Sequence, residues 1–367
     1  MKHLLLLGGG HSHVHVLADL ARRPLLGAKV TLVTPYASLL YSGMLPGWVA
    51  GRFGIESCRI AFKPLVQAAG VTLIESMATA LDATGRTLGL ANGQVLRYDM
   101  LSVNTGPVVD RDVITGAREH ALFLRPLEHF VPLWERVVEL AAQRELALVV
   151  IGGGAAGVEL ALAIERRLGD RVRVNLVTGA PGLLPGVAAG ARRRASACLR
   201  QRRISVLESD AVAITATQVM LANGSRLDCD APIVAVGSGA PPWLRGSGLA
   251  LDEAGFIQTG PSLQSLSHAE VFAAGDVAVR PDAPRPHSGV FAVRAGPPLA
   301  RNLRRHLRGA RLRRHRPQAR ALYLLSCADG TAIGHWGPLS WGGRWAGGWK
   351  DRLDRRFVAR YAGRGAG

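Results

Sequence analysis

The stretches HLLLLGGGHSHVHVLADLARR at residues 3–23 and LALVVIGGGAAGVELALAIERR at residues 146–167 share one layout. Each has an apolar run, three glycines and then a helical pattern of apolar residues. A β-branched run follows each of them, KVTLVT at 29–34 and RVNLVT at 173–178. This repetition predicts two strand–helix–strand units and two nucleotide-sized sites.

The glycine spacing in both turns suits a pyrophosphate. In GxGxxG the first glycine allows a tight turn, the second lets the backbone approach the pyrophosphate, and the third lets helix and strand pack closely. The second turn is complete, with Gly152, Gly154 and Gly157. The first turn has Gly8 and Gly10 but His13 in the third place, so we expect a slightly wider helix–strand contact there. His13→Gly is then expected to leave nucleotide binding intact.

The second strand of each unit lacks the terminal acidic residue that usually binds a ribose hydroxyl. Thr34 and Thr178 stand there instead. A threonine can still hydrogen-bond a ribose hydroxyl, but it does not repel a 2′-phosphate as a carboxylate would. The sequence therefore leaves NADH and NADPH both open, with the arginines at 192–194 as cations that a 2′-phosphate can contact.

The chain is strongly basic. Its formal net charge is +18, and all but four of its 45 basic residues are arginine. The densest run, at 301–320, is either a solvated helix and loop or a surface for the phosphates of lipid or nucleic acid. Because no nucleic-acid-binding motif accompanies the charge, lipid headgroups rank above nucleic acid.

Cysteine spacing and hydropathy bear on the compartment. No CxxC or CxxxxC pair occurs among Cys58, Cys198, Cys229 and Cys327, which argues against a redox disulfide and a zinc site. The first apolar run is too short for a signal peptide, and no uncharged apolar run is long enough to span a membrane. We expect a reducing, cytoplasmic location, with contact at the membrane face as an option.

Three histidines, His11, His13 and His15, follow the first glycines. On a helix His11 and His15 share a face while His13 points away, so at most two of them can bind one metal ion. Asp19 is the one nearby acidic residue at a usable spacing. We therefore expect no metal site, and place His11 at the helix N-terminus, where a ring N–H can support a pyrophosphate.

Four further segments complete a known pattern. They are RYDMLSVNTGP at 97–107, LDCDAPIVAVGSGAPPWL at 227–244, AEVFAAGDVA at 269–278 and HSGVFAVRAGPPLARNL at 287–303. With the two glycine turns, they resemble the FAD-dependent pyridine nucleotide-disulfide oxidoreductase-like family. Within it the chain is most similar to the branch of type II NADH dehydrogenases and sulfide:quinone reductases.

Other stretches are similar to a subgroup of that branch. They include GGGHSHV at 8–14, TPYASLLYSGMLPGWVAG at 34–51 and the tail GHWGPLSWGGRWAGGWKDRLDRRFVARY at 334–361. Members of this subgroup occur alone or fused N-terminal to a selenide, water dikinase domain. The similarity does not fix the electron acceptor.

The resemblance implies an α/β fold of two interleaved Rossmann-like dinucleotide-binding domains, one for FAD and one for NAD(P)H, plus a small C-terminal element. The FAD-binding domain would take residues 1–112 and 251–310. The NAD(P)H-binding domain would take 113–250, and 311–367 would form a basic and aromatic C-terminal element.

The resemblance also assigns residues to FAD. The pyrophosphate would lie at Gly8, Gly10 and His11, the adenosine ribose near Thr34 and Pro35, the adenine side at Thr105 and Gly106, the ribityl chain at Gly275 and Asp276, and the pyrimidine end of the ring at Ala292. Residues 36–46 would line the approach to the flavin. Each glycine or threonine also has a plain structural role as an alternative, but Asp276 has little purpose in packing.

For NAD(P)H, the resemblance implies binding by Gly152, Gly154, Gly157, Thr178 and Gly237. Glu159 would lie near the nicotinamide and is the candidate catalytic residue, although a favourable interaction with the helix dipole explains a carboxylate there equally simply.

The implied reaction is hydride transfer from NAD(P)H to flavin, followed by transfer of electrons to a quinone or other small acceptor. Two alternatives stay open. One is a redox accessory flavoprotein of selenium or sulfur metabolism, in which Cys58 would take part. The other is a flavoprotein without catalysis whose basic tail binds membrane or nucleic acid.

The C-terminal tail bears on the partners. Trp336, Trp341, Trp345, Trp349 and Phe357 stand there among Arg and Lys, a mixture suited to a membrane interface. Inward packing of these aromatic residues is the other interpretation. NAD(P)H, a quinone or other small acceptor, peripheral membrane contact and a homodimer are the partners considered, with nucleic acid disfavoured.

Overall fold

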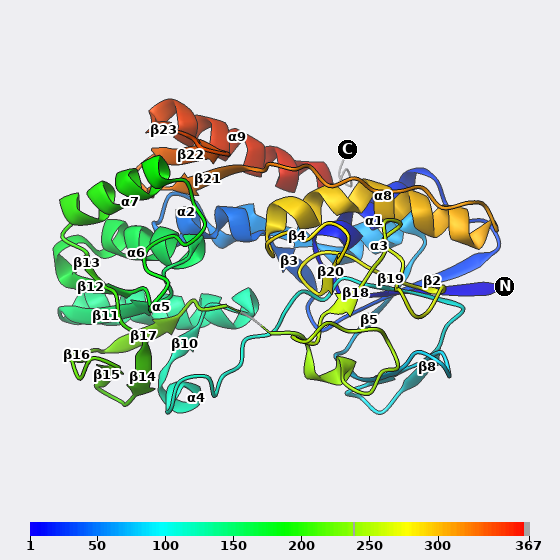
Figure 1. The fold of residues 1–367 in the computed structure, drawn as a ribbon, viewed down its shortest axis with the longest axis horizontal. Helices are drawn as coiled ribbons and strands as arrows, with labels where there is room; N and C mark the ends of the chain where they lie inside the picture. Colours follow the sequence, from blue (N-terminus) through cyan, green and yellow to red (C-terminus); the bar gives the residue numbers. More distant parts are fainter. Residues whose placement is uncertain (238, 363–367) are drawn as a thin grey trace.

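A computed structural model describes residues 1–237 and 239–362 of the chain. The fold is built on two five-stranded parallel sheets, which lie on opposite sides of the molecule (Figure 1). The first sheet has the order β19-β9-β1-β2-β5, and its strands are β1 (Lys2–Leu7), β2 (Ala28–Thr34), β5 (Thr72–Glu75), β9 (Met100–Val103) and β19 (Val271–Ala273).

The second sheet repeats this plan in the order β10-β17-β11-β12-β13. Its strands are β10 (Leu122–Phe123), β11 (Leu146–Ile151), β12 (Val172–Val177), β13 (Ser205–Leu207) and β17 (Ala231–Val234). The chain builds most of the first sheet, crosses to build the second, and returns to add β19. This arrangement confirms the predicted fold class of two interleaved Rossmann-like domains.

The central strands are buried on both faces. Leu4 and Leu6 of β1 pack in one apolar cluster, whereas Leu5 and Leu7 pack in another. Parallel sheets covered on both sides require such continuous apolar runs. This is why LLLL and LALVVI, rather than alternating patterns, begin the two units.

Helices cover one face of each sheet, and a small antiparallel sheet lies against the other side. The helices are α1 (His11–Arg22), α3 (Phe62–Ala69) and α8 (Gly289–Leu307) for the first sheet and α5 (Leu127–Gln143), α6 (Ala155–Leu168) and α7 (Ala189–Gln201) for the second. The small sheets are β6 (Ala78–Asp82), β7 (Thr87–Leu90), β8 (Val95–Arg97) and β14 (Ala211–Ile214), β15 (Gln218–Leu221), β16 (Arg226–Asp228). Shorter elements are β3 (Ser38–Leu40), α2 (Leu45–Val49), β4 (Arg59–Ala61), α4 (Ala117–His120), β18 (Ile257–Gln258) and β20 (Ala278–Val279).

Two crossovers connect the domains and pair with each other. Val108 and Gly239 exchange backbone hydrogen bonds of 2.9 and 2.8 Å. Beyond this pair, Leu244 and Leu249 already pack in the same cluster as Leu81 of β6.

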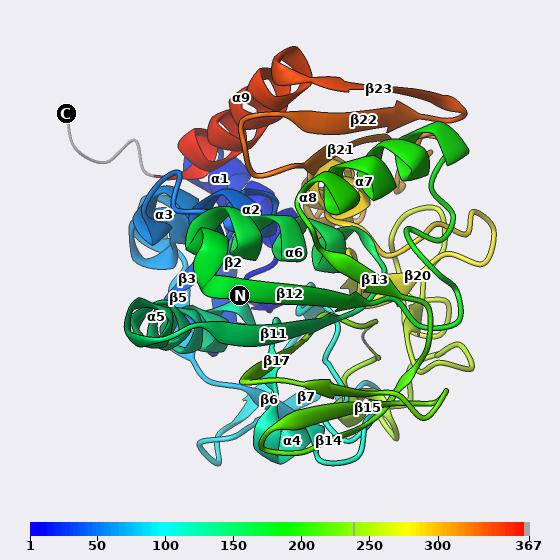
Figure 2. The same cartoon turned by 90° about the vertical axis from the view of Figure 1, so that its left-hand side faces the viewer.

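A C-terminal element lies across both domains. It consists of the antiparallel strands β21 (Leu322–Ser326), β22 (Ala332–Trp336) and β23 (Leu339–Gly343), followed by α9 (Arg344–Tyr361). Figures 1 and 2 show its sheet beside α7 and its helix running toward α1. No helix within the described part of the chain combines the length and apolar character needed to cross a bilayer.

The third glycine of the second turn is required by backbone packing. A Cβ at Gly157 would lie 1.9 Å from the carbonyl oxygen of Gly152. No described atom lies within 4 Å of the corresponding position at Gly154. Gly157 is therefore needed for the packing of the helix on the turn, whereas Gly154 leaves the turn open to a ligand.

We predict that Gly157→Ala lowers the free energy of unfolding by about 2 to 3 kcal/mol, because the helix must move away from the turn. Gly154→Ala, the matched control, should leave stability within about 0.5 kcal/mol of the parent. Urea denaturation followed by circular dichroism measures both. Equal stability of the two variants would contradict the packing role of Gly157.

Candidate functional site

Strand register brings the residues assigned to FAD to one edge of the first sheet. Leu7 pairs with Val33 and with Val103, and Val103 pairs with Ala273. The turns that follow these strands carry the assigned residues Gly8, Gly10, Thr34, Pro35, Thr105, Gly106, Gly275 and Asp276. They therefore meet at the carboxyl edge, where open α/β sheets bind their ligands.

The second sheet has the same arrangement. Ile151 pairs with Val177 and with Val234, so the turns after these three strands meet at one edge. These turns carry Gly152, Gly154, Thr178 and Gly237. The Thr178 hydroxyl donates to the carbonyl oxygen of Leu207 at 3.3 Å, which leaves its lone pairs to accept a hydrogen bond.

The first glycine turn is closed by β9 and the residues after it. Gly8 has a φ of +90°, and a Cβ there would lie 2.5 Å from the Cα of Thr105. A Cβ at Gly10 would lie 2.5 Å from the carbonyl oxygen of Asn104. Both positions therefore require glycine because of the neighbouring backbone.

Asn104 holds this turn together, and the sequence offered no signal for it. Its side-chain oxygen accepts the backbone N–H of Ser12 at 3.0 Å and that of His13 at 3.1 Å. Its amide nitrogen donates to the carbonyl oxygen of Ala274 at 2.6 Å, just before Gly275. One buried side chain thus caps the N-terminus of α1 and holds the turn before Gly275. This turn lies in the segment at 269–278, which resembles the second flavin fingerprint of the family.

His13 fills the space of the missing third glycine. Its Nδ1 lies 2.6 Å from the carbonyl oxygen of Gly8, and its Nε2 lies 2.8 Å from the hydroxyl of Ser102. Burial lowers the pKa of His13 to about 4, so the ring is neutral at neutral pH. His13→Gly would remove both hydrogen bonds and so lower the stability of the turn. The spacing of the glycines does not predict this loss.

The rings of His11 and His15 both lie against aromatic residues of α9. The His11 ring lies edge-on to Tyr41, with ring centroids 5.5 Å apart, and against Phe357 of α9. Its Nε2 is buried and has no hydrogen-bond partner among the described residues. Burial, with a contribution from Arg125, lowers the pKa of His11 to about 4. The His15 Nδ1 lies 3.1 Å from the hydroxyl of Tyr361.

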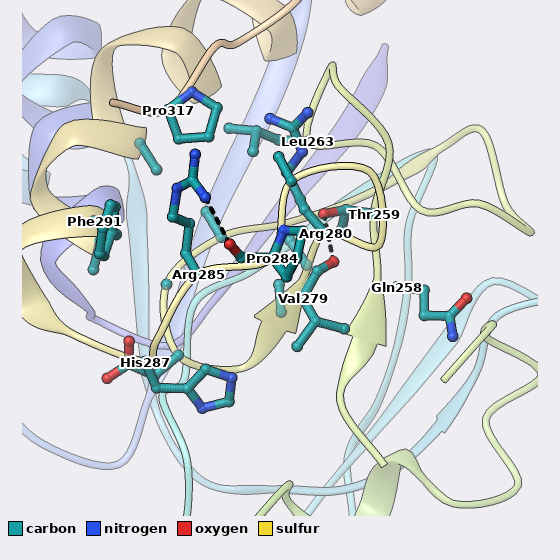
Figure 3. A pocket seen from close by; sticks show the side chains of 18 of the residues that line it. Gln258, Thr259, Leu263, Val279, Arg280, Pro284, Arg285, His287, Phe291 and Pro317 are labelled. Atoms are coloured by element: carbon teal, nitrogen blue, oxygen red, sulfur yellow. Dashed lines mark hydrogen bonds between the residues drawn. The ribbon is translucent and has the colours of Figure 1, made fainter. Parts of the chain in front are cut away.

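A cavity of about 680 Å³ adjoins the second flavin fingerprint. Three assigned residues, Gly275, Asp276 and Ala292, line it. Figure 3 shows Phe291 on the side of α8 and Arg285 and Pro284 across the space. Glycine backbone, a carboxylate and the start of α8 therefore face a space large enough for part of a nucleotide.

The charges around Asp276 are mixed. Burial raises the pKa of Asp276, while Arg125, His287 and the backbone N–H of Ser288 act in the opposite direction. The charge of Arg125 also contributes to the lowered pKa of His11. Arg125 follows β10 of the other domain, and no motif in the sequence marks it.

Gly275 and Asp276 give this cavity part of what a flavin nucleotide requires. Apart from the cavity, the buried Nε2 of His11 has no partner among the described residues, which leaves a hydrogen bond for a ligand or water there. A carboxylate aimed at a cavity suits the hydroxyls of a ribityl chain. The residues present therefore fit FAD.

Glu159 lies under the C-terminal element. Its carboxylate accepts the backbone N–H of Ser326 at 2.7 Å. Burial raises the pKa of Glu159, although the nearby Lys350 opposes this shift. The carboxylate therefore sits where α6 meets β21.

Lys350 is the cation beside Glu159. It is buried, and its Nζ donates to the carbonyl oxygen of Gly43 and to Asp354, both at 2.7 Å. Burial acts to lower the pKa of Lys350, but Glu159 and Asp354 raise it on balance. Gly43 belongs to the segment expected to line the approach to the flavin. The sequence motifs did not mark Lys350, although a lysine is rare in this chain, with only four among 45 basic residues.

The remaining predicted positions are less constrained. Pro35, Thr105 and Gly237 are exposed, as are the arginines at 192–194 on α7. Cys58 is buried, and burial raises the pKa of its thiol to about 12. It is therefore a poor redox group as it stands.

Two dinucleotide-type edges and a bridging element define a two-domain nucleotide-dependent oxidoreductase. The chain belongs to the pyridine nucleotide-disulphide oxidoreductase family, which matches residues 2–297. A curated relative, the demethylphylloquinone reductase of Synechocystis sp., is 27% identical over 294 residues, or 76% of this chain and 72% of that protein.

Solved structures share the fold over nearly the whole chain. The sulfide:quinone oxidoreductase from Aquifex aeolicus has a TM-score of 0.83 at 18% identity, covering 99% of this chain and 92% of that one. NDH2 from Plasmodium falciparum, solved with NADH, has a TM-score of 0.81 at 12% identity and covers 97% of each chain. Both likenesses show that the fold, over nearly the whole chain, is shared with these proteins.

We predict that Asn104→Ala lowers the free energy of unfolding by about 2 to 4 kcal/mol, because buried backbone groups of Ser12, His13 and Ala274 lose their partner. Purified protein should also retain less flavin per chain. Asn223→Ala, which removes an exposed turn hydrogen bond to Ser225, is the control. Unchanged stability and flavin content in Asn104→Ala would contradict the role given to this residue.

Proposed function

We propose that the protein is an FAD-dependent oxidoreductase that takes hydride from NAD(P)H and passes the electrons to a quinone or another small acceptor. The observation that carries this proposal is the pair of glycine turns at the carboxyl edges of two parallel sheets. Family membership and the names of the relatives, a quinone reductase, a sulfide:quinone oxidoreductase and an NDH2, support it.

The first edge would hold FAD. Bound FAD supplies two-electron hydride chemistry, while the protein supplies position and electrostatics. Gly8, Gly10 and His11 would meet the pyrophosphate, with Arg125 as a cation near it. Thr34, Pro35, Thr105 and Gly106 would contact the adenosine end, and Gly275, Asp276 and Ala292 the ribityl chain and ring.

The second edge would hold NAD(P)H. Gly154 has open space in front of it, so a pyrophosphate can approach the N-terminus of α6. Gly152 and Gly157 shape the turn, while Thr178 and Gly237 flank it. Thr178 can accept a hydrogen bond from a ribose hydroxyl. Position 178 itself carries no carboxylate, but Asp210 lies nearby and accepts the backbone N–H of Ala180 at 3.1 Å.

Glu159 and Lys350 would serve the acceptor. Reduction of a quinone to a quinol consumes two protons, which the protein must deliver in a water-poor site. Glu159 is a buried carboxyl with a raised pKa, and the nearby Lys350 donates to Gly43 in the segment expected to line the approach to the flavin. Orientation of the two cofactor edges remains the main catalytic contribution of the fold.

The C-terminal element would place the protein on the cytoplasmic membrane face. Trp341, Trp345 and Trp349 stack in a row, with ring centroids 6.2 and 6.3 Å apart. Trp345 is 60% exposed and Trp349 39% exposed, beside arginines of α9. Exposed indoles next to cations favour the headgroup region of an anionic membrane. At that surface the protein would be close to quinone dissolved in the membrane.

Anaerobic titration of the flavin-loaded protein tests the function. We expect NADH or NADPH to bleach the flavin absorbance stoichiometrically and a quinone to restore it. In Glu159→Gln we expect bleaching at the parental rate but reoxidation about 100-fold slower, because a proton-holding group is lost. Absence of bleaching with either nucleotide would sink the proposal.

Sedimentation with vesicles of phosphatidylglycerol and phosphatidylcholine tests the membrane contact. The double variant Trp345→Ala, Trp349→Ala should bind about tenfold less, because two interfacial side chains are removed. Leu140→Ala, which changes an equally exposed apolar residue on α5, should bind like the parent. Equal binding of all three proteins would exclude this surface.

A further inference from the structure

Two cysteines far apart in the sequence meet where the C-terminal element lies on the second domain. Cys198 is on α7, and Cys327 directly follows β21. Both pack in one apolar cluster, and each thiol lies close enough to shift the pKa of the other. Figure 2 shows α7 lying along this sheet, and α7 contacts both β22 and β23.

An ion pair next to the two cysteines joins the segments that carry them. Arg202, one helical turn after Cys198, donates to Asp329, two residues after Cys327, with an Nη2–Oδ2 distance of 2.7 Å. The same guanidinium contacts Glu165 of α6 at 3.3 Å. The contact between the two thiols is therefore set by a side-chain frame on both sides.

The two thiols differ in access. Cys198 is partly exposed, whereas Cys327 is buried. Cys327 and the charge of Arg202 lower the pKa of Cys198, whereas Cys198 and burial raise the pKa of Cys327. By contrast, burial raises the pKa of Cys229 to about 12. Cys198 therefore has the thiolate character and exposure of a reactive cysteine, with a second thiol in contact to resolve it.

We propose that Cys198 and Cys327 form a peroxide-responsive dithiol that closes into a reversible disulfide between the NAD(P)H-binding domain and the C-terminal element. This site has no part in the proposed reaction at the flavin. Its formation depends only on the packing of α7 against the C-terminal element, whose strands β22 and β23 it contacts.

The chemistry balances with a hydroperoxide as the oxidant. The Cys198 thiolate attacks one peroxide oxygen, the O–O bond breaks, and Cys198 becomes a sulfenic acid while the leaving oxygen takes a proton and departs as water or alcohol. The Cys327 sulfur then attacks the sulfur of Cys198, so that an S–S bond forms and the S–O bond breaks, releasing water. Two electrons pass from the two sulfurs to the peroxide.

The disulfide would fasten β21 to α7 next to Ser326, whose backbone N–H binds Glu159. In the dithiol form this junction is held by noncovalent contacts alone. Oxidation would therefore lock the cover over Glu159, a consequence that rests on the proposed function, unlike the disulfide itself.

Mass spectrometry after alkylation tests the disulfide. The flavin-loaded protein is treated with hydrogen peroxide, alkylated under denaturing conditions and digested. We expect a peptide pair linked through Cys198 and Cys327, loss of alkylation at these two sites alone, and full reversal by dithiothreitol. The melting temperature of the oxidised protein should rise, because the cross-link constrains the unfolded chain.

Variants separate the roles of the two thiols. Cys327→Ser should leave Cys198 to over-oxidise to the sulfinic acid, while Cys198→Ser should slow peroxide oxidation of Cys327 at least tenfold. Cys229→Ser, the matched control, should form the link as the parent does. A link to another cysteine, over-oxidation of Cys198 in the parent without a link, or no reaction would each overturn the proposal. Flavin bleaching by NADH, measured on the same samples, reports the proposed function separately.

Discussion

The side chain of Asn104 connects three segments that the flavin edge needs in fixed positions. It receives two N–H groups from the first turn of α1 and donates to the backbone just before Gly275. A parallel sheet alone aligns its strands but does not fix the turns beyond them. Because Asn104 is buried and fully engaged, the glycine turn and the Gly275–Asp276 turn can move only together.

The two nucleotide edges solve the same problem differently. In the second turn Gly157 lets α6 touch the backbone of Gly152, and Gly154 faces open space. In the first turn an imidazole stands between helix and strand, and Asn104 takes two of the helix N–H groups that a phosphate would otherwise receive. Side chains thus hold the turn at the first edge, whereas backbone packing alone holds the turn at the second. This difference suits a cofactor that stays bound at the first edge and a cosubstrate that exchanges at the second.

The sequence predicted the fold because its signals are local. Strand, glycine turn and helix follow one another within each repeat, and the apolar runs read directly as buried strands. Asn104, Arg125 and the contact between Cys198 and Cys327 escaped because each acts on residues more than 80 positions away. No spacing rule connects such partners. Glu159 was singled out for its place on α6, but its neighbours Ser326 and Lys350 come from the other end of the chain.

The C-terminal element is attached to both domains, and this bears on how they can move. The crossovers paired at Val108 and Gly239 resemble a two-stranded hinge, about which one domain could rotate against the other. Lys350 donates a hydrogen bond to Gly43 of the first domain. Ser326 donates one to Glu159 of the second domain, and Asp329 forms an ion pair with Arg202 there. Because the C-terminal element contacts both domains away from the paired crossovers, it opposes rotation of one domain against the other. The C-terminal element therefore restrains the relative position of the two domains, so rotation about the paired crossovers would require these contacts to break.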